Sequence, residues 1–379
     1  MLQSDLLAVA IQANVTTLLL GLPGVGKSAI VRQIVQEIEK QKHGGKGFPF
    51  VISNAAQVQP EDLGGAPVPN HTDKVMEAYA MGKLKPLVKA QRGCHMIDEY
   101  VSAQGPVRAA CLSILEGRLY GDTHLPDVSV VAVGNPPNVA TDGQDLSTPE
   151  SNRFFFLNWE LSNEVWFNYM LSGPGAIRDL PILPDNWRES VPGAKQTIVR
   201  FLQKSPMYVH KMPETAEEMN KPWPSQRAWE KAADFIGALR ACGYSWSSDH
   251  VAAALAGTVG SSIADVFQAW MRTMDLPDPE DMLADPANAE AMLPKRHDHI
   301  MHAFEALAMA AADRNNKKWP ERWQTAWDIF APHMISHPDR VLPAARVMSQ
   351  SKPAGGKFPP NAHLLLKLRR DIGISESGT

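Results

Sequence analysis

The eight residues from Gly21 to Ser28 constrain the fold of this chain more than any other segment. They read Gly-Leu-Pro-Gly-Val-Gly-Lys-Ser and fit the phosphate-binding pattern G-x-x-x-x-G-K-[ST]. The glycines let the backbone bend so that successive N–H groups face phosphate oxygens, and a helix that starts at the loop adds its positive dipole end. In such a loop Lys27 reaches the β- and γ-phosphates and the Ser28 hydroxyl binds Mg²⁺. ATP and Mg²⁺ are therefore the expected ligands.

The residues around this loop predict a strand before it and a helix after it. Val15–Gly21 is an apolar run of strand length, and Ser28–Lys42 repeats apolar residues at the period of a buried helix face. Four further apolar runs have strand length: Phe48–Ser53, His95–Asp98, Val128–Gly134 and Phe154–Trp159. Continuous apolar runs are typical of parallel strands that are buried on both faces. The sequence therefore predicts an α/β fold with a parallel sheet.

The second part of the chain has a different composition. All ten tryptophans lie between Trp159 and Trp327. Trp319, Trp323 and Trp327 follow one another at intervals of four, which places them on one helix face and predicts core packing. The remaining helical candidates are Arg227–Arg240, His299–Asp313, Glu321–Ala331 and Asn361–Asp371.

A short apolar strand that ends in two acids is the second candidate for chemistry. Cys94-His95-Met96-Ile97 precede Asp98 and Glu99, about 70 residues after the phosphate loop. A carboxylate at a strand end beside such a loop can support Mg²⁺, and the next one can polarise an attacking water. We assign Asp98 to the metal and Glu99 to the water. His95 is expected to be a core histidine.

Composition and charge argue against several classes of protein. The formal net charge of −4 disfavours a broadly basic nucleic-acid binder, so nucleic acid is not the expected partner. Three scattered cysteines are too few for a disulfide framework. The sequence contains no run of 18 apolar residues, so membrane insertion is not expected. A secretory signal requires positive charge near its start, but no Lys or Arg precedes Lys27. We expect a cytoplasmic protein.

The order of these motifs resembles the AAA+ ATPases, and within them the MoxR-like branch of the helix-2-insert group. Pro60-Glu61-Asp62-Leu63-Gly64-Gly65 follows the second strand, where that branch carries its helix-2 insertion. Ala110–Gly117 resembles the family's helix that ends in Leu-Leu-Glu-x-x, and Leu119–Pro126 resembles a pre-sensor hairpin.

Three later segments resemble the family's sensor and arginine motifs. Val130–Pro137 is similar to the sensor-1 strand, with Asn135 at its polar position. Pro149–Phe154 looks like the box ending in Asp-Arg-Phe, with Asn152 where Asp is usual and Arg153 as the arginine finger. Pro224–Trp229 resembles the start of the sensor-2 helix. The resemblance implies that Arg153 acts on the nucleotide of a neighbouring subunit and that Arg227 reaches the phosphates from a helical lid.

The resemblance also implies the site as a set. The catalytic residues would be Glu99, Asn135, Arg153 and Arg227, and the metal would be held by Ser28 and Asp98. The nucleotide would contact Gly21, Pro23, Gly24, Val25, Gly26, Lys27, Ser28 and Ala29. An ordinary salt bridge remains the alternative for Arg153, and a surface helix position remains the alternative for Arg227. Arg118 could be a second interface arginine.

The resemblance implies a domain organisation and an assembly. The expected parts are an AAA+ core at 1–175 with the helix-2 insert at about 60–85, an α-helical lid at 176–295, and a helical C-terminal extension at 296–379. A ring, most often a hexamer, is implied, and it would remodel or activate a client protein or a partner with a von Willebrand factor A domain. The insert and the hairpin would contact the client. The alternatives are a nucleic-acid motor, related to restriction or helicase ATPases, and a nucleotide-gated adaptor that does not hydrolyse ATP.

Overall fold

The structure is a computed structural model that describes residues 2–137, 139–140, 143–172, 180–273, 276–295, 297–314 and 316–362. Contacts within the chain divide it into two compact units, Met1–Met271 and Arg272–Thr379, which we describe separately. This division does not coincide with the expected boundaries at 175/176 and 295/296. The separation of the first unit into a core and a lid stays a prediction.

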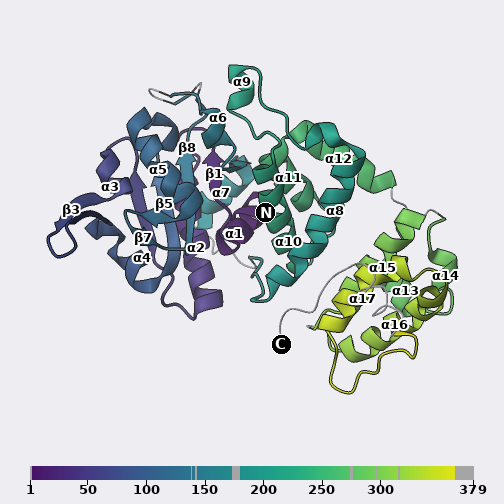
Figure 1. The fold of residues 1–379 in the computed structure, drawn as a ribbon. Coiled ribbons are helices and arrows are strands. Elements are labelled where there is room, and N and C mark those ends of the chain that lie inside the picture. The colour runs from purple at the N-terminus through teal and green to yellow at the C-terminus, as the bar shows by residue number, and fades with distance from the viewer. Residues whose placement is uncertain are drawn as a thin grey trace. The chain divides into compact units, whose positions relative to one another are not determined.

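The first unit is built around a five-stranded sheet in which every neighbouring pair is parallel (Figure 1). The strands lie in the order β2-β5-β8-β1-β9. Their bounds are Thr17–Leu20 (β1), Phe50–Asn54 (β2), Arg92–Asp98 (β5), Asp127–Gly134 (β8) and Phe155–Asn158 (β9). The five predicted apolar runs thus form the sheet, and the predicted α/β class with a parallel sheet is confirmed.

The sheet is buried on both faces, as continuous apolar strands require. Along β8, Val130 and Ala132 belong to one hydrophobic cluster, whereas Val131 and Val133 belong to another. All four side chains have no exposed surface. Helices therefore cover both faces. Those before β9 are α1 (Leu2–Gln12), α2 (Lys27–His43), α3 (Pro60–Gly64), α4 (Lys85–Ala90), α5 (Gly105–Gly117) and α6 (Thr148–Ser151).

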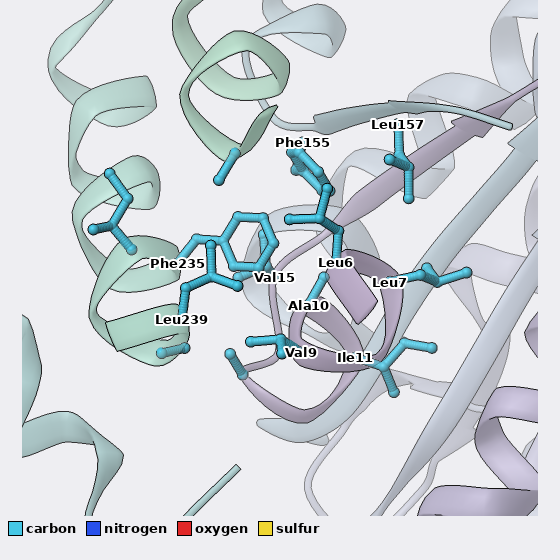
Figure 2. Close-up of a cluster of buried hydrophobic side chains, with 14 of the residues drawn as sticks. Leu6, Leu7, Val9, Ala10, Ile11, Val15, Phe155, Leu157, Phe235 and Leu239 are labelled. Atoms are coloured by element: carbon cyan, nitrogen blue, oxygen red, sulfur yellow. The ribbon is translucent and has the colours of Figure 1, made fainter. Parts of the chain in front are cut away.

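Helix α1 connects the sheet to the helices that follow it. Every residue from Leu6 to Ile11 is buried, so this part of the helix is surrounded by core on all sides. Figure 2 shows its side chains beside Phe155 of β9 and beside Phe235 of α10 (Gln226–Ala241). One continuous core therefore joins the sheet to the later helices of the unit, which are α7 (Asn163–Ser172), α8 (Val191–Lys204), α9 (Ala216–Met219), α10 (Gln226–Ala241), α11 (Asp249–Val259) and α12 (Ser261–Thr273).

Two small hairpins lie in the segments where an insertion and a pre-sensor hairpin were expected. They pair β3 (Ala66–Asn70) with β4 (Val75–Tyr79), and β6 (Leu119–Tyr120) with β7 (Thr123–His124). The hairpins touch, because the Asp122 N–H donates to the Ala78 carbonyl and the Ala78 N–H donates to the Asp122 carboxylate. A Cβ on Gly121 would meet that same carbonyl, so the close contact requires glycine. Whether the first hairpin is the helix-2 insert stays a prediction.

The second unit is helical and has its own core. Its helices are α13 (Pro279–Ala284), α14 (Ala289–Met292), α15 (His297–Ala311), α16 (Trp319–Ser336) and α17 (Pro338–Gln350). Trp323 and Trp327 are fully buried in this core and Trp319 is partly exposed, so core packing is confirmed for two of the three tryptophans of the predicted stripe. The helix expected at Asn361–Asp371 lies almost entirely outside the described residues. Among the helices that are described, none combines the length and the apolar character needed to cross a bilayer.

The histidine in β5 is a neutral core group. His95 is fully buried, and its ring nitrogens lie 2.9 Å from Ser53 Oγ and 3.2 Å from Tyr120 Oη. Burial lowers the pKa of His95 to about 3. The prediction of a core histidine is thus confirmed.

This histidine makes stability depend on pH. The unfolded chain takes up a proton at His95 near pH 6.5 and the folded chain does not, so stability is lost as pH falls below that value. We expect about 2 kcal/mol to be lost between pH 7 and pH 5 through this residue. Urea unfolding of the wild type and of His95→Asn at both pH values measures it, because the other histidines contribute equally to both proteins. An equal loss in the two proteins would contradict the assignment.

Candidate functional site

The order of the strands brings the predicted motifs to one edge of the sheet. Leu20 of β1 lies in register with Gly134 of β8, and Ile97 of β5 lies in register with Ala132 of β8. The carboxyl ends of parallel strands meet at one edge. Because β8 lies between β1 and β5, Asn135 emerges between the phosphate loop and Asp98.

The phosphate loop has the backbone that its glycines permit. Gly24 and Gly26 both have φ of +79°, a left-handed conformation that L side chains rarely adopt. Gly26 is the residue before α2, so the free N–H groups of the first helical turn, which include Lys27, Ser28 and Ala29, lie directly after the loop. A loop followed by a helix N-terminus is suited to bind phosphate.

The Lys27 ammonium is held at the centre of the site. Its Nζ donates to the carbonyls of Gly21 (2.7 Å) and Leu22 (2.9 Å) and to Asn135 Oδ1 (2.8 Å). Burial lowers the pKa of Lys27, and the carboxylates of Glu99 and Asp98 oppose part of that shift. The structure therefore brings Lys27 and Asn135, which are 108 residues apart, into direct contact.

Ser28 and Asp98 form an oxygen pair at the start of α2. The Ser28 hydroxyl donates to Asp98 Oδ2 at 3.0 Å. Hydroxyl and carboxylate oxygens are suitable ligands for Mg²⁺, which usually takes few ligands from protein and others from phosphate and water. Among the described residues there is no cluster of three His, Cys, Asp or Glu side chains that could hold a metal without such help. The pair therefore fits Mg²⁺ bound together with a phosphate ligand.

Glu99 occupies an unusual backbone conformation. Its φ is +52°, in the left-handed region, and its N–H donates to Asp98 Oδ1 at 3.0 Å. A non-glycine residue in this region is held there by its surroundings, and such strain often accompanies a functional site.

Trp159 supports the phosphate loop, and the motif patterns do not identify it. It follows β9, and its indole N–H donates to the Val25 carbonyl at 3.1 Å. A Cβ on Gly21 would lie 2.6 Å from the Trp159 carbonyl oxygen, so the two backbones can meet only at a glycine. The one available signal is position, since Trp159 is the first tryptophan of the chain and ends the last predicted strand.

Arg153 and Arg227 lie together at a different place. Both bind Glu116 near the end of α5: Arg153 Nη2 to Oε2 at 2.7 Å and Arg227 Nη2 to Oε1 at 2.8 Å. Arg153 lies before β9, whereas Trp159 lies after it beside the loop. Six extended residues span roughly 20 Å. The two arginines are therefore at the opposite edge of the sheet from Lys27, and Arg227 contacts Glu116 rather than the phosphate loop.

Arg118 is a structural residue at that second edge. Its guanidinium is buried and donates to Asn14 Oδ1 (2.9 Å) and to the Leu115 carbonyl (2.5 Å). Burial lowers the pKa of Arg118 to about 10. These internal contacts account for the burial of Arg118, and its role as a second interface arginine stays a prediction.

Comparisons with known proteins leave the family of this chain open. No protein-family model matches the sequence, and no curated protein matches it significantly. Among solved structures, the fold is similar to that of a candidate ATPase from Cytophaga hutchinsonii, with 15% identity and a TM-score of 0.45. That alignment covers 69% of this chain and 87% of the other. At this level of likeness the neighbour does not identify the family.

Trp159→Phe removes the hydrogen bond to the Val25 carbonyl but keeps an aromatic ring against the loop. We expect a triphosphate to bind roughly fivefold more weakly, as the loss of about 1 kcal/mol from one hydrogen bond predicts. Isothermal titration calorimetry with inorganic tripolyphosphate measures this, with Trp246→Phe as the matched control. Unchanged affinity in Trp159→Phe would show that the indole does not position the loop.

Proposed function

We propose that this protein is a Mg²⁺-dependent ATPase of the MoxR-like AAA+ type. The observation that carries the proposal is the convergence of Lys27, Ser28, Asp98, Glu99 and Asn135 at the carboxyl edge of one parallel sheet. These residues supply a phosphate loop, an oxygen pair for a metal, a carboxylate for water and a polar side chain beside the lysine.

Each residue has a role in the hydrolysis of ATP by water. The loop amides and Lys27 bind the triphosphate and offset its charge. Mg²⁺ held by Ser28 and Asp98 would neutralise charge on the β- and γ-phosphates. Glu99 takes a proton from the attacking water, and Asn135 orients that water and Lys27. The products are ADP and inorganic phosphate.

Arg153 would act on the nucleotide of a second copy. It lies at the sheet edge opposite to the phosphate loop, so it cannot reach the nucleotide of its own subunit. Arg227 binds the same Glu116 carboxylate as Arg153 and would act together with Arg153. An arginine that acts in trans requires a head-to-tail interface, and such an interface gives a ring when its rotation closes. We propose a homo-oligomeric ring, most often a hexamer in proteins of this type.

The proposed use of ATP hydrolysis is to remodel or activate a partner protein, such as one with a von Willebrand factor A domain. The β3–β4 hairpin, as the helix-2 insert, is the segment proposed to contact the client. Val75 and Met76 of this hairpin are 51% and 62% exposed, and exposed apolar side chains of this kind are typical of contact surfaces.

A mixing experiment tests the trans arrangement. Lys27→Ala removes the phosphate-binding lysine, and Arg153→Ala removes only the arginine offered to a neighbour. Each variant alone should lose more than ~100-fold in ATP turnover, since an arginine finger contributes about 10³–10⁵. An equimolar mixture should recover roughly a quarter of wild-type turnover, because a quarter of randomly mixed interfaces combine an intact loop with an intact arginine.

The matched control mixes Lys27→Ala with Glu99→Gln. Both changes damage the same face of the subunit, so no mixed interface is intact and no recovery is expected. Phosphate release measures both mixtures. If the first mixture stays as inactive as its components although the chains exchange, the trans role of Arg153 is wrong.

A further inference from the structure

The pair of arginines is held by one carboxylate that no motif assigns to a role. Glu116 accepts from Arg153 Nε (2.9 Å) and Nη2 (2.7 Å) on one oxygen and from Arg227 Nη2 (2.8 Å) on the other. Two guanidinium groups from separate elements on one oxyanion form the arrangement by which proteins bind phosphate. The structure therefore contains an anion site whose occupant is a side chain.

Positive charge exceeds negative charge at this position. Lys231 lies one turn after Arg227 on α10 and donates to the Asn152 carbonyl at 3.1 Å. Burial lowers the pKa of Lys231 well below its ordinary value, the guanidinium groups of Arg227, Arg118 and Arg153 lower it further, and Glu116 opposes the shift. Two arginines thus share one carboxylate, and a buried lysine lies close to them.

The contact is also open to solvent. The side chains of Glu116 and Arg227 are 44% and 48% exposed, so their pair contributes little stability, whereas the Arg153 side chain is 15% exposed. An exposed carboxylate can be exchanged for another anion at small cost, whereas a buried one cannot. This openness distinguishes Glu116 from a carboxylate that only holds the fold together.

We propose that Glu116 is a latch: its carboxylate occupies the place of a phosphoryl group between Arg153 and Arg227, and an arriving polyphosphate must displace it. This inference rests on the proposed function, in which the arriving group is the γ-phosphate of ATP bound to a second copy of the chain. The latch keeps the arginines ordered in a free subunit and delays assembly until nucleotide is bound.

Glu116→Gln tests the latch, because it keeps the shape of the side chain and removes its charge. The probe is inorganic tripolyphosphate, titrated by calorimetry at low salt into proteins that all carry Lys27→Ala, which weakens binding at the phosphate loop. Adding Glu116→Gln should tighten binding roughly tenfold, and adding Arg153→Gln as well should reverse the gain. Adding Glu217→Gln, which breaks the exposed pair with Lys221, controls for net charge and should change nothing.

The latch is wrong if Glu116→Gln leaves the affinity unchanged, or if Glu217→Gln increases it equally. Glu116→Ala repeats the test should the glutamine variant not fold, with the same expected gain. These titrations need neither hydrolysis nor assembly. If these titrations fail, the latch is wrong, but the result of the mixing experiment still stands. If the mixing experiment fails, the anion site remains, but the nucleotide of a neighbouring subunit is excluded as its occupant.

Discussion

The parallel pairing of β1 with β8 and β9 is the constraint on which the site depends. It fixes where Gly21, Asn135 and Trp159 leave the sheet, because Leu20 is in register with both Gly134 and Asn158. Lys27 can then reach Asn135, and Trp159 can hold Val25. The apolar residues that bury both faces of the sheet therefore also determine the geometry of the phosphate loop. Stability and function use the same strands.

The same sheet separates two sets of charged groups. The phosphate loop and the Asp98–Glu99 pair lie at the carboxyl edge, and the Arg153–Glu116–Arg227 cluster lies at the amino edge. A strand's length of backbone separates Arg153 from the phosphate loop of its own subunit, and Arg227 lies beside Arg153. Under the proposed function, each subunit therefore contributes its phosphate loop to one active site and its arginines to another.

Local patterns predicted the parallel sheet and the segments that the structure brings together around Lys27. Apolar runs identified the five strands, because parallel strands buried on both faces have a distinct composition. The loop at Gly21–Ser28 and the acids after β5 were found because their chemistry lies in consecutive residues. The pairing of Arg227 with Glu116 and the support of the loop by Trp159 join residues more than 100 positions apart, and no periodicity encodes such contacts. The boundary at Met271 was equally invisible, since α12 runs across it.

Mass photometry of Glu99→Gln with and without Mg-ATP tests the central claim most directly. The substitution removes the carboxylate that activates water and leaves the phosphate loop intact, so bound ATP should persist. If Arg153 completes a neighbour's site, the particles should shift from one subunit to about six when Mg-ATP is added. Particles that stay at the mass of one subunit, with ATP binding confirmed in the same sample, would contradict an active site shared between subunits.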